Sequence, residues 1–203
     1  MDFLSVHGHK TGNLDNTYIN IHQGLIDACC RGDRDAQFKI YKLYYKAMYN
    51  TSLRIVNNTA EAEDIMQESF LDAFRRIESY TGEGSFGSWL KRIVVNRSLD
   101  YLRKYQETVS LETQPVDLPD EDDAGFQEEV QFRVAEVRKA ISELPDDYRI
   151  ILSLVLLEGY DHEEISQILN ITNQLSRTRY SRARQKLITV LRERERLCAY
   201  SNN

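Results

Sequence analysis

The chain has 203 residues, of which 26 are Lys or Arg and 32 are Asp or Glu, and its formal net charge is −6. This length excludes a peptide module and an assembly of several large domains, and it fits one domain or two small ones. Hydrophobic residues make up 41% and charged residues 29%, which is a globular rather than a disordered composition. The acidic excess argues against a chain that coats nucleic acid along its whole length.

The composition predicts an α-helical protein of the cytoplasm. Three Pro and nine Gly are few for an all-β protein with many tight turns. The three cysteines (Cys29, Cys30 and Cys198) show no CxxC spacing, which predicts reduced thiols rather than a zinc site or a disulfide scaffold. Residues 1–10 lack the apolar core of a signal peptide, and the longest apolar run, residues 154–157, is far shorter than the ~20 residues that span a bilayer.

The N-terminal half is predicted to be a helical unit. The first 20 residues are polar and aperiodic, and we expect residues 1–22 to form a flexible tail. Asp33 is a predicted N-cap for a helix with one apolar face, formed by Phe38, Tyr41, Tyr45 and Met48. A turn at residues 57–59 precedes a second helix, whose apolar stripe contains Ile65, Ser69, Phe70, Ala73, Phe74 and Ile77. A loop at residues 81–85 then leads into a third helix, expected at about residues 88–104.

The middle of the chain is predicted to be an acidic linker. Residues 112–129 contain eight acidic and no basic residues, together with Pro115, Pro119 and Gly125. Like charges repel one another and proline disfavours helix, so we expect an extended linker, placed at residues 106–128. The rest of the chain carries a net charge of +2. The acidity therefore belongs to the linker and does not exclude a nucleic-acid partner.

The C-terminal half is predicted to be a second helical unit, residues 129–197. Pro145 is well placed to begin a helix that Gly159 ends. A short helix at residues 162–169, a break of three residues and a long basic helix at about residues 173–196 then form a helix-turn-helix arrangement. The fold class predicted is thus all-α, with two small helical domains joined by the linker, each with a core of its own.

The long basic helix is the strongest candidate for a binding site. From Thr172, its predicted N-cap, through Lys186 it has five basic and no acidic residues. The planar fork of Arg can bind phosphate or the edge of guanine, so we favour DNA binding. The predicted inward side consists of Ser176, Tyr180, Ala183 and Leu187. A solvated helix without a partner, or a site for RNA or an acidic protein, are the alternatives.

Two further stretches carry candidate sites. On the third helix Trp89, Ile93, Asn96 and Asp100 share one stripe, with basic residues around it. Aromatic residues mixed with cations suit unstacked single-stranded bases, although Phe86 and Trp89 could be core and Asn96 a buried, hydrogen-bonded amide. Residues 62–70 place carboxylates on one face of a helix, which could be solvated or could dock a basic partner.

No catalytic set is recognised. The four histidines (His7, His9, His22 and His162) have no Ser or Cys partner at a recognisable spacing, and no Gly-rich phosphate loop is present. We therefore expect no enzyme activity, no cofactor, no metal and no small-molecule substrate.

Several motifs, taken together in order, resemble those of a known family. They are Glu63-Asp64-Ile65-x-Gln67-Glu68-x-Phe70, Phe86-x-x-Trp89-Leu90-x-x-Ile93-x-x-Asn96-x-x-x-Asp100-x-x-Arg103, Leu144-Pro145, Glu164-Ile165 and Arg177-x-Arg179-x-x-Arg182-Ala183-Arg184-x-x-Leu187. The chain resembles bacterial RNA polymerase sigma factors of the sigma-70 superfamily, of the extracytoplasmic-function (ECF) type. The resemblance implies sigma region 2 at residues 23–105, sigma region 4 at residues 129–197, and promoter-specific transcription initiation as the function.

The resemblance also implies partners and site residues. Binding to the β′ clamp coiled coil of core RNA polymerase is implied for Asp64, Gln67, Glu68 and Phe70. Contact with the melted minus-10 element of promoter DNA is implied for Tyr80, Ser85, Phe86, Trp89, Lys91, Arg92, Asn96 and Arg97. Contact with the minus-35 element is implied for Thr172, Asn173, Arg177, Thr178, Arg179, Ser181, Arg182 and Arg184. Region 4 is also expected to hold the polymerase β flap, and an anti-sigma factor is an expected partner.

One spot departs from the family pattern. Where relatives usually have Gly-Thr-Val, this chain has Gln174-Leu175-Ser176, so Ser176 stands where a small apolar side chain would pack. The pose of the recognition helix therefore depends on how Ser176 is accommodated. The alternative functions are a stand-alone helix-turn-helix transcriptional regulator, which would need a ligand pocket or dimer face in its N-terminal unit, and a protein-only adaptor.

Overall fold

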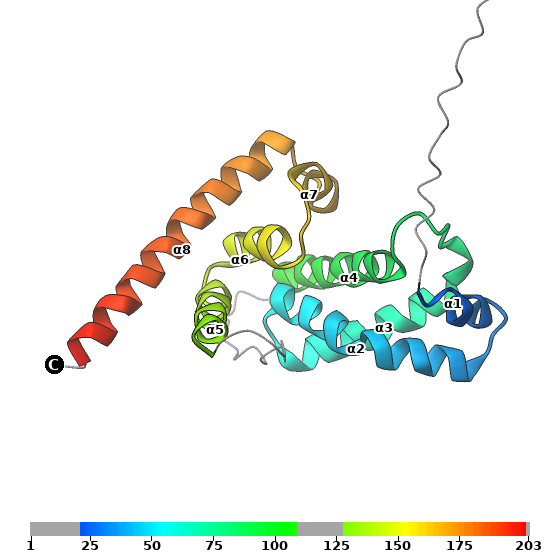
Figure 1. Cartoon of the computed structure of the whole chain (residues 1–203). Coiled ribbons are helices and arrows are strands. Elements are labelled where there is room, and N and C mark those ends of the chain that lie inside the picture. Colours follow the sequence, from blue (N-terminus) through cyan, green and yellow to red (C-terminus); the bar gives the residue numbers. More distant parts are fainter. Residues whose placement is uncertain (1–20, 109–127, 202–203) are drawn as a thin grey trace, which may run out of the picture.

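The computed structural model describes residues 21–108 and 128–201, and within these ranges all regular structure is helical. The first range contains α1 (Gln23–Cys30), α2 (Arg34–Val56), α3 (Thr59–Arg75), the short 3₁₀ turn η1 (Ile77–Ser79) and α4 (Phe86–Thr108). The second contains α5 (Glu128–Ser142), α6 (Asp146–Leu152), the π-helical turn η2 (Ser153–Leu157), α7 (His162–Leu169) and α8 (Asn173–Ser201), as Figure 1 shows. The predicted all-α fold is confirmed.

The predicted tail and linker fall largely outside these ranges. Residues 1–20 of the tail and 109–127 of the linker are not described, and residues 106–108 extend α4. Among the helices of the two described ranges, none combines the length and the apolar character that crossing a membrane requires.

Side-chain caps set the helix boundaries of the N-terminal half. The Asp33 carboxylate accepts hydrogen bonds from the N–H groups of Asp35 (2.9 Å) and Ala36 (3.1 Å), as predicted. Asn57 ends α2 with a φ of 54°, and the Asn58 side chain accepts the Glu61 N–H at 3.2 Å to begin α3. The predicted turn at residues 57–59 is therefore one residue longer than the observed one.

Similar devices build the helix-turn-helix of the C-terminal half. Asp161 and Glu164 form a capping box at the start of α7, and Asn170 closes the helix with a φ of 53°. The hydroxyl of Thr172 accepts the Leu175 N–H at 3.1 Å, which confirms Thr172 as the N-cap of α8. Gly159 has a φ of 78°, a left-handed conformation that suits glycine where the chain leaves η2.

The helices enclose two apolar clusters. One lies within α1–α4 and contains Ile26, Ile40, Met48, Met66, Phe70, Phe86, Leu90 and Val94. The other joins the two halves: Leu53, Ile55, Val95 and Leu99 pack in one cluster with Ile141, Leu144, Ile151, Leu152 and Leu154. The sequence predicted a separate core for each half, and the second cluster departs from that expectation.

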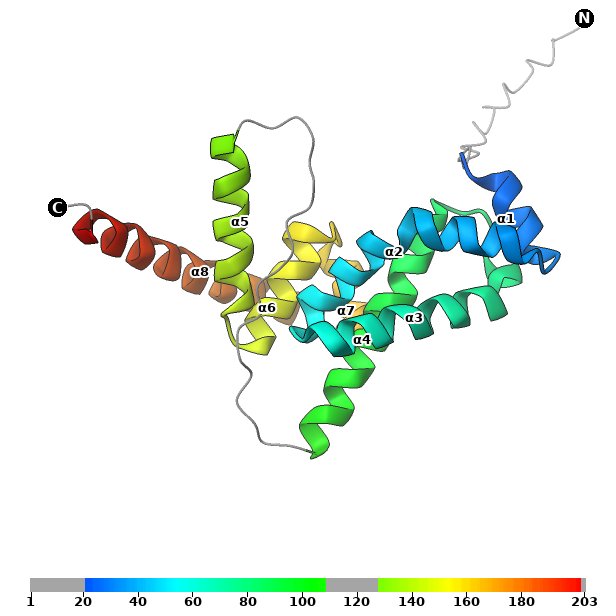
Figure 2. The same ribbon diagram turned by 90° about the horizontal axis from the view of Figure 1, so that it is seen from below.

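The C-terminal end of α2 explains this shared core. Seven consecutive residues, 51–57, are buried, because α3, α4 and α6 surround the last two turns of the helix. Both views show α6 lying against the N-terminal half, beside the C-terminal end of α2 and beside α4 (Figures 1 and 2). Four of these seven residues are polar (Thr51, Ser52, Arg54 and Asn57), so the sequence pattern does not show that another element covers this end of the helix.

Candidate interaction surfaces

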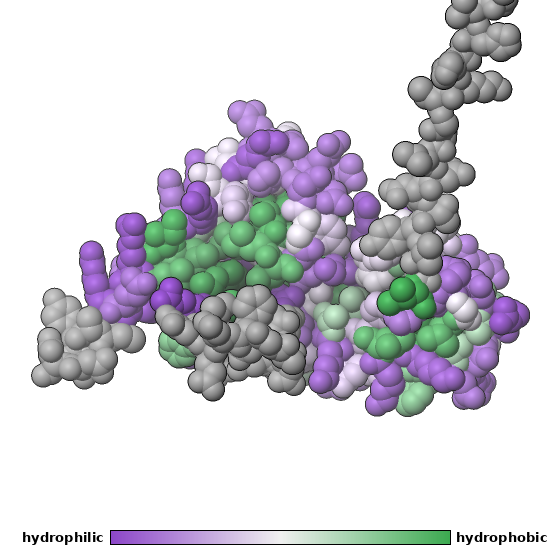
Figure 3. Space-filling view, in the orientation of Figure 1, coloured by the Kyte–Doolittle hydropathy of each residue, from purple (hydrophilic) through white to green (hydrophobic). Residues whose placement is uncertain are grey.

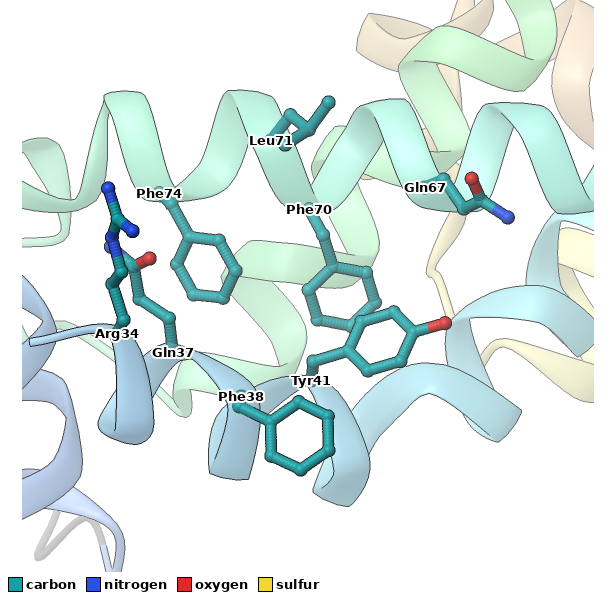
Figure 4. Close-up of a pocket in the computed structure, with 8 residues that line it drawn as sticks. All are labelled: Arg34, Gln37, Phe38, Tyr41, Gln67, Phe70, Leu71 and Phe74. Atoms are coloured by element: carbon teal, nitrogen blue, oxygen red, sulfur yellow. The ribbon is translucent and has the colours of Figure 1, made fainter.

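An apolar groove runs between α2 and α3 (Figure 4). It has a volume of about 490 Å³ and is lined by Arg34, Gln37, Phe38, Tyr41, Gln67, Phe70, Leu71 and Phe74. The floor is Phe70, which is buried and packs edge-on against Tyr41 at a ring-centroid distance of 4.9 Å. The rim includes two large exposed side chains, Phe38 (60% exposed) and Leu71 (56%). Exposed apolar side chains around a concave surface are typical of a docking site.

The groove contains only part of the predicted core-polymerase set. Gln67 and Phe70 line it, whereas Asp64 and Glu68 do not. The sequence prediction did not include Leu71, and it placed Phe38 on the apolar face of its helix without giving it a binding role. Their positions in the sequence could have pointed to them, since Phe38 lies one helical turn before Tyr41 and Leu71 directly follows Phe70. Which edge of the two helices stays exposed to solvent follows only from the packing of α2 on α3.

Arg97 ties α4 to α3. Its Nε donates to Oδ2 of Asp72 at 2.9 Å, and its guanidinium also pairs with the Glu68 carboxylate. The hydrogen bond from Arg97 lowers the pKa of Asp72 below its usual value. Glu68, predicted to contact polymerase, and Arg97, predicted to contact DNA, are thus partners of each other in this structure.

Asn96 lies beside a polar cleft between the same two helices. The cleft has a volume of about 560 Å³, and its lining includes Glu68, Asp72, Arg76, Asn96, Asp100 and Lys104. Asn96 is exposed, so it is not the buried amide that the sequence left open as an alternative. Its amide is available to a ligand that enters the cleft.

An aromatic cluster supports the loop before α4. Phe86 is buried at its centre, with ring centroids 5.4 Å from Tyr80 and 5.3 Å from Trp89. The Tyr80 hydroxyl donates to the carbonyl of Gly84 at 2.8 Å and so braces the exposed loop. Phe86 is therefore core, as the alternative interpretation had it, while Tyr80, Ser85 and Trp89 are partly exposed.

The remaining two residues predicted for minus-10 DNA, Lys91 and Arg92, differ in their surroundings. Nζ of Lys91 is 3.0 Å from Oε2 of Glu158, which belongs to the C-terminal half. Arg92, the next residue, is exposed. The eight predicted minus-10 residues therefore do not form one continuous surface in this conformation.

The N-terminal part of α8 presents a basic face. Arg177, Thr178, Ser181, Arg182 and Arg184 are exposed, as are Gln174 and Leu175. Nε of Arg177 donates to Oδ1 of Asn173 at 2.8 Å, so these two predicted DNA residues act together. Arg179 is half-buried and lies 3.8 Å from the Asp147 carboxylate.

The predicted inward side of α8 is confirmed, and it accommodates Ser176 with a polar partner. Ser176 and Ala183 are fully buried, Leu187 is 6% exposed and Tyr180 is half-buried. Oγ of Ser176 lies 2.9 Å from Nδ1 of His162, at the start of α7. The His162 ring also packs against Tyr180, with centroids 5.5 Å apart. The departure from the family pattern is thus matched by a hydrogen bond between the two helices of the motif.

A further apolar surface lies on the C-terminal half. Figure 3 shows a broad hydrophobic area over α5, α6 and α8, bordered by hydrophilic residues. The partly buried hydrophobic residues of these helices include Val137, Tyr148, Val190 and Leu191. No residue of this surface was in the predicted sites, because its members come from three helices far apart in sequence.

Comparison with known proteins identifies the same two regions. The family model for sigma-70 region 2 matches residues 40–108, and that for sigma-70 region 4 matches residues 135–187. The chain is 31% identical over 178 residues to the ECF RNA polymerase sigma factor SigW of Bacillus subtilis, covering 80% of this chain and 92% of that one. It is 28% identical over 182 residues to the RNA polymerase sigma-H factor of Pseudomonas aeruginosa, covering 83% and 93%.

Solved structures show the same fold. CnrH, solved with the cytosolic domain of CnrY, matches with a TM-score of 0.53 at 19% identity, over 85% of this chain and 97% of that one. The sigma factor RpoE of Bartonella quintana, solved with the anti-sigma factor NepR, matches with a TM-score of 0.57 at 20% identity, over 76% and 95%. From these matches and the two family regions, the chain belongs to the ECF RNA polymerase sigma factors of the sigma-70 family.

Proposed function

We propose that the α2–α3 groove binds core RNA polymerase and that α4 and α8 read the two elements of a promoter. Membership of the ECF family makes the chain a sigma factor that directs promoter-specific initiation. In the proposed role it contributes specificity, performs no reaction of its own and works in the cytoplasm with the polymerase. The single observation that carries the proposal is the presence of both sigma regions in one chain.

The groove suits a helical partner. Its apolar floor, with Phe38 and Leu71 on the rim, can receive the apolar face of a helix such as those of the β′ clamp coiled coil. Asp64 and Gln67 are exposed on α3, and they would contact the polar or basic flank of that partner. We propose the apolar surface over α5, α6 and α8 for the β flap, because it too is an open hydrophobic face.

The loop before α4 and the cleft between α3 and α4 suit a single DNA strand of a melted promoter. Tyr80 and Trp89 offer ring surfaces for stacking, and the exposed amide of Asn96 can hydrogen-bond a base extruded from the stack. In this proposal Phe86 holds the two aromatic side chains in place, and Arg97 orients α4 on α3. Neither needs to touch DNA itself.

Reconstituted transcription tests the function directly. Purified chain, core polymerase and genomic promoter fragments should give run-off transcripts that neither protein produces alone. Active core that yields no chain-dependent transcript from any fragment would refute the proposal. A gel shift on duplex DNA without core, at physiological salt, would instead favour a stand-alone helix-turn-helix regulator.

An anti-sigma factor is the remaining proposed partner. CnrH and RpoE were each solved with a second protein, and NepR is named as an anti-sigma factor. For this chain we propose a partner of the same kind. Co-purification with a single small protein, lost when transcription is activated, is the expected result.

A further inference from the structure

The Glu158 carboxylate is buried where the two halves of the molecule meet. Its side chain is 1% exposed and lies just after η2, in the C-terminal half. Nη1 of Arg54 lies 2.8 Å from Oε1, Nζ of Lys91 lies 3.0 Å from Oε2, and the Thr51 hydroxyl donates to Oε2 at 3.0 Å. All three partners belong to α2 and α4, so this one side chain connects region 4 to region 2.

Other polar contacts cross the same boundary. The Arg149 side chain is 2% exposed, and its Nη2 donates to the carbonyl of Ile55 at 2.9 Å. The Asn57 amide donates to the carbonyl of Ser142 at 3.2 Å, and Nη2 of Arg103 donates to the carbonyl of Ile168 at 3.5 Å. Together with the shared apolar core, these contacts hold region 4 against the same side of α4 that carries Lys91.

This arrangement is too compact for a two-part promoter. Elements centred about 25 base pairs apart are separated by roughly 85 Å along straight DNA, at about 3.4 Å per base pair. Helix α4 has 23 residues and is therefore about 35 Å long, and the helix-turn-helix contacts it through Arg103 and α7. The two DNA-reading surfaces must move apart before both can engage.

The closed arrangement also withholds a cation from DNA. The family resemblance implies minus-10 DNA contact for Lys91, yet its ammonium group is paired with Glu158. A carboxylate in that position resembles a phosphate oxygen in charge and in hydrogen-bonding capacity. Leaving it buried after the loss of its partners is costly, so the contacts should break together when the halves separate.

We propose that the free protein rests in this closed conformation and that Glu158 is its latch, occupying Lys91 and Arg54 until polymerase and promoter DNA separate the two regions. The closed conformation reduces the fraction of molecules that are able to bind core polymerase. The apparent dissociation constant for core polymerase rises in inverse proportion to that fraction. Loosening the latch therefore opens the molecule and tightens its binding to core polymerase. The conformational part stands on the contacts alone, whereas the effect on polymerase rests on the proposed function.

Two substitutions test the latch in the full chain. Glu158→Gln keeps the shape and removes the charge, and Thr51→Val keeps the volume and removes one donor. Glu193→Gln is the matched control, since Glu193 is exposed on α8 outside this contact. Small-angle X-ray scattering of the free protein should give a larger radius of gyration for both test variants, and affinity for labelled core should rise roughly threefold or more for Glu158→Gln.

The outcomes separate the two proposals. An unchanged radius for Glu158→Gln and Thr51→Val, with native circular dichroism, overturns the latch. If Glu158→Gln does not fold, Thr51→Val decides alone by the same measure. A larger radius with no binding to core by any variant would support the latch and refute the proposed function.

Discussion

At the scale of single residues, Ser176 shows how a local departure from the family pattern is accommodated. A small apolar residue at this buried position would pack without a partner, whereas the hydroxyl needs a hydrogen bond because it is removed from water. His162 supplies that bond from the preceding helix at 2.9 Å. The pair therefore joins α7 to α8 through a directional contact.

We expect Ser176→Ala to lower the free energy of unfolding by about 1 kcal/mol, since His162 Nδ1 loses its partner in a half-buried site. Urea denaturation monitored by circular dichroism would measure the change. Ser181→Ala, on the exposed side of the same helix, should stay within about 0.5 kcal/mol of wild type. Equal effects of the two substitutions would contradict the structural role of the Ser176–His162 bond.

Leu71 is the residue that best tests the α2–α3 groove. Leu71→Glu should weaken binding to core polymerase roughly tenfold or more, because it places a charge where an apolar contact is expected. The fold should survive, since Leu71 is 56% exposed. Leu43→Glu is the matched control, because Leu43 is 51% exposed on α2 and does not line the groove. Fluorescence titration of labelled protein with core would compare them, and equal losses would count against the groove.

At the scale of elements, the sequence predicts helices better than it predicts their open faces. The caps at Asp33 and Thr172 follow from local chemistry, and the buried stripe of α3 follows from its periodicity. The predicted apolar face of α2 contains both Phe38 and Met48, yet Met48 is buried and Phe38 is 60% exposed, because α3 covers only part of that side of α2. Exposure of this kind depends on tertiary packing, which helical periodicity alone does not contain.

The pairing of α3 with α4 predicts a dependence on acid. The pKa of Asp72 is lowered in the folded state by the hydrogen bond from Arg97, so the stabilisation is present above the unfolded pKa of about 3.9 and is lost as pH falls through the lower folded pKa. Asp72→Asn should therefore lose less stability than wild type between about pH 5 and pH 2. Urea midpoints across this range would show it, with Asp64→Asn, exposed on the same helix, as control. Parallel curves for wild type and Asp72→Asn would exclude the effect.

The basic face of α8 predicts a loss of promoter reading. Arg177→Ala with Arg182→Ala should weaken minus-35-dependent binding of the polymerase complex, at about 1–3 kcal/mol for each Arg that contacts a base, and reduce the salt slope of binding. Arg192→Ala is a suitable control, because Arg192 is exposed on α8 well beyond the helix-turn-helix. Footprinting at two salt concentrations would test this, and an unchanged footprint in the minus-35 region would contradict it.

At the scale of the whole molecule, the shared core is what the sequence did not predict. Residues 51–57 pack against α6, and their partners lie some 90 residues further along the chain. No local pattern specifies such a pairing, because hydrophobic residues on both surfaces are equally compatible with two separate domains. The burial of Glu158 could not be predicted either, because a single acidic residue between a hydrophobic run and a glycine is typical of an exposed helix end.

The shared core predicts that the free protein unfolds as one unit. Differential scanning calorimetry should give a single transition in which the calorimetric and van't Hoff enthalpies agree. Two separate domains on a linker would instead give two transitions, or a calorimetric enthalpy well above the van't Hoff enthalpy. Glu158→Gln should lower the cooperativity, because it weakens the contact between the halves, whereas Glu193→Gln should not.

The buried C-terminal end of α2 also indicates what holds the two halves of the molecule together. Its seven buried residues make the association of the two halves a property of their surfaces rather than of the chain that connects them. A single peptide-bond cleavage within residues 109–127 would therefore leave a noncovalent pair of fragments instead of two free ones. The connecting segment sets how often the halves meet again after they part, in other words their effective concentration, and is not needed to keep them together.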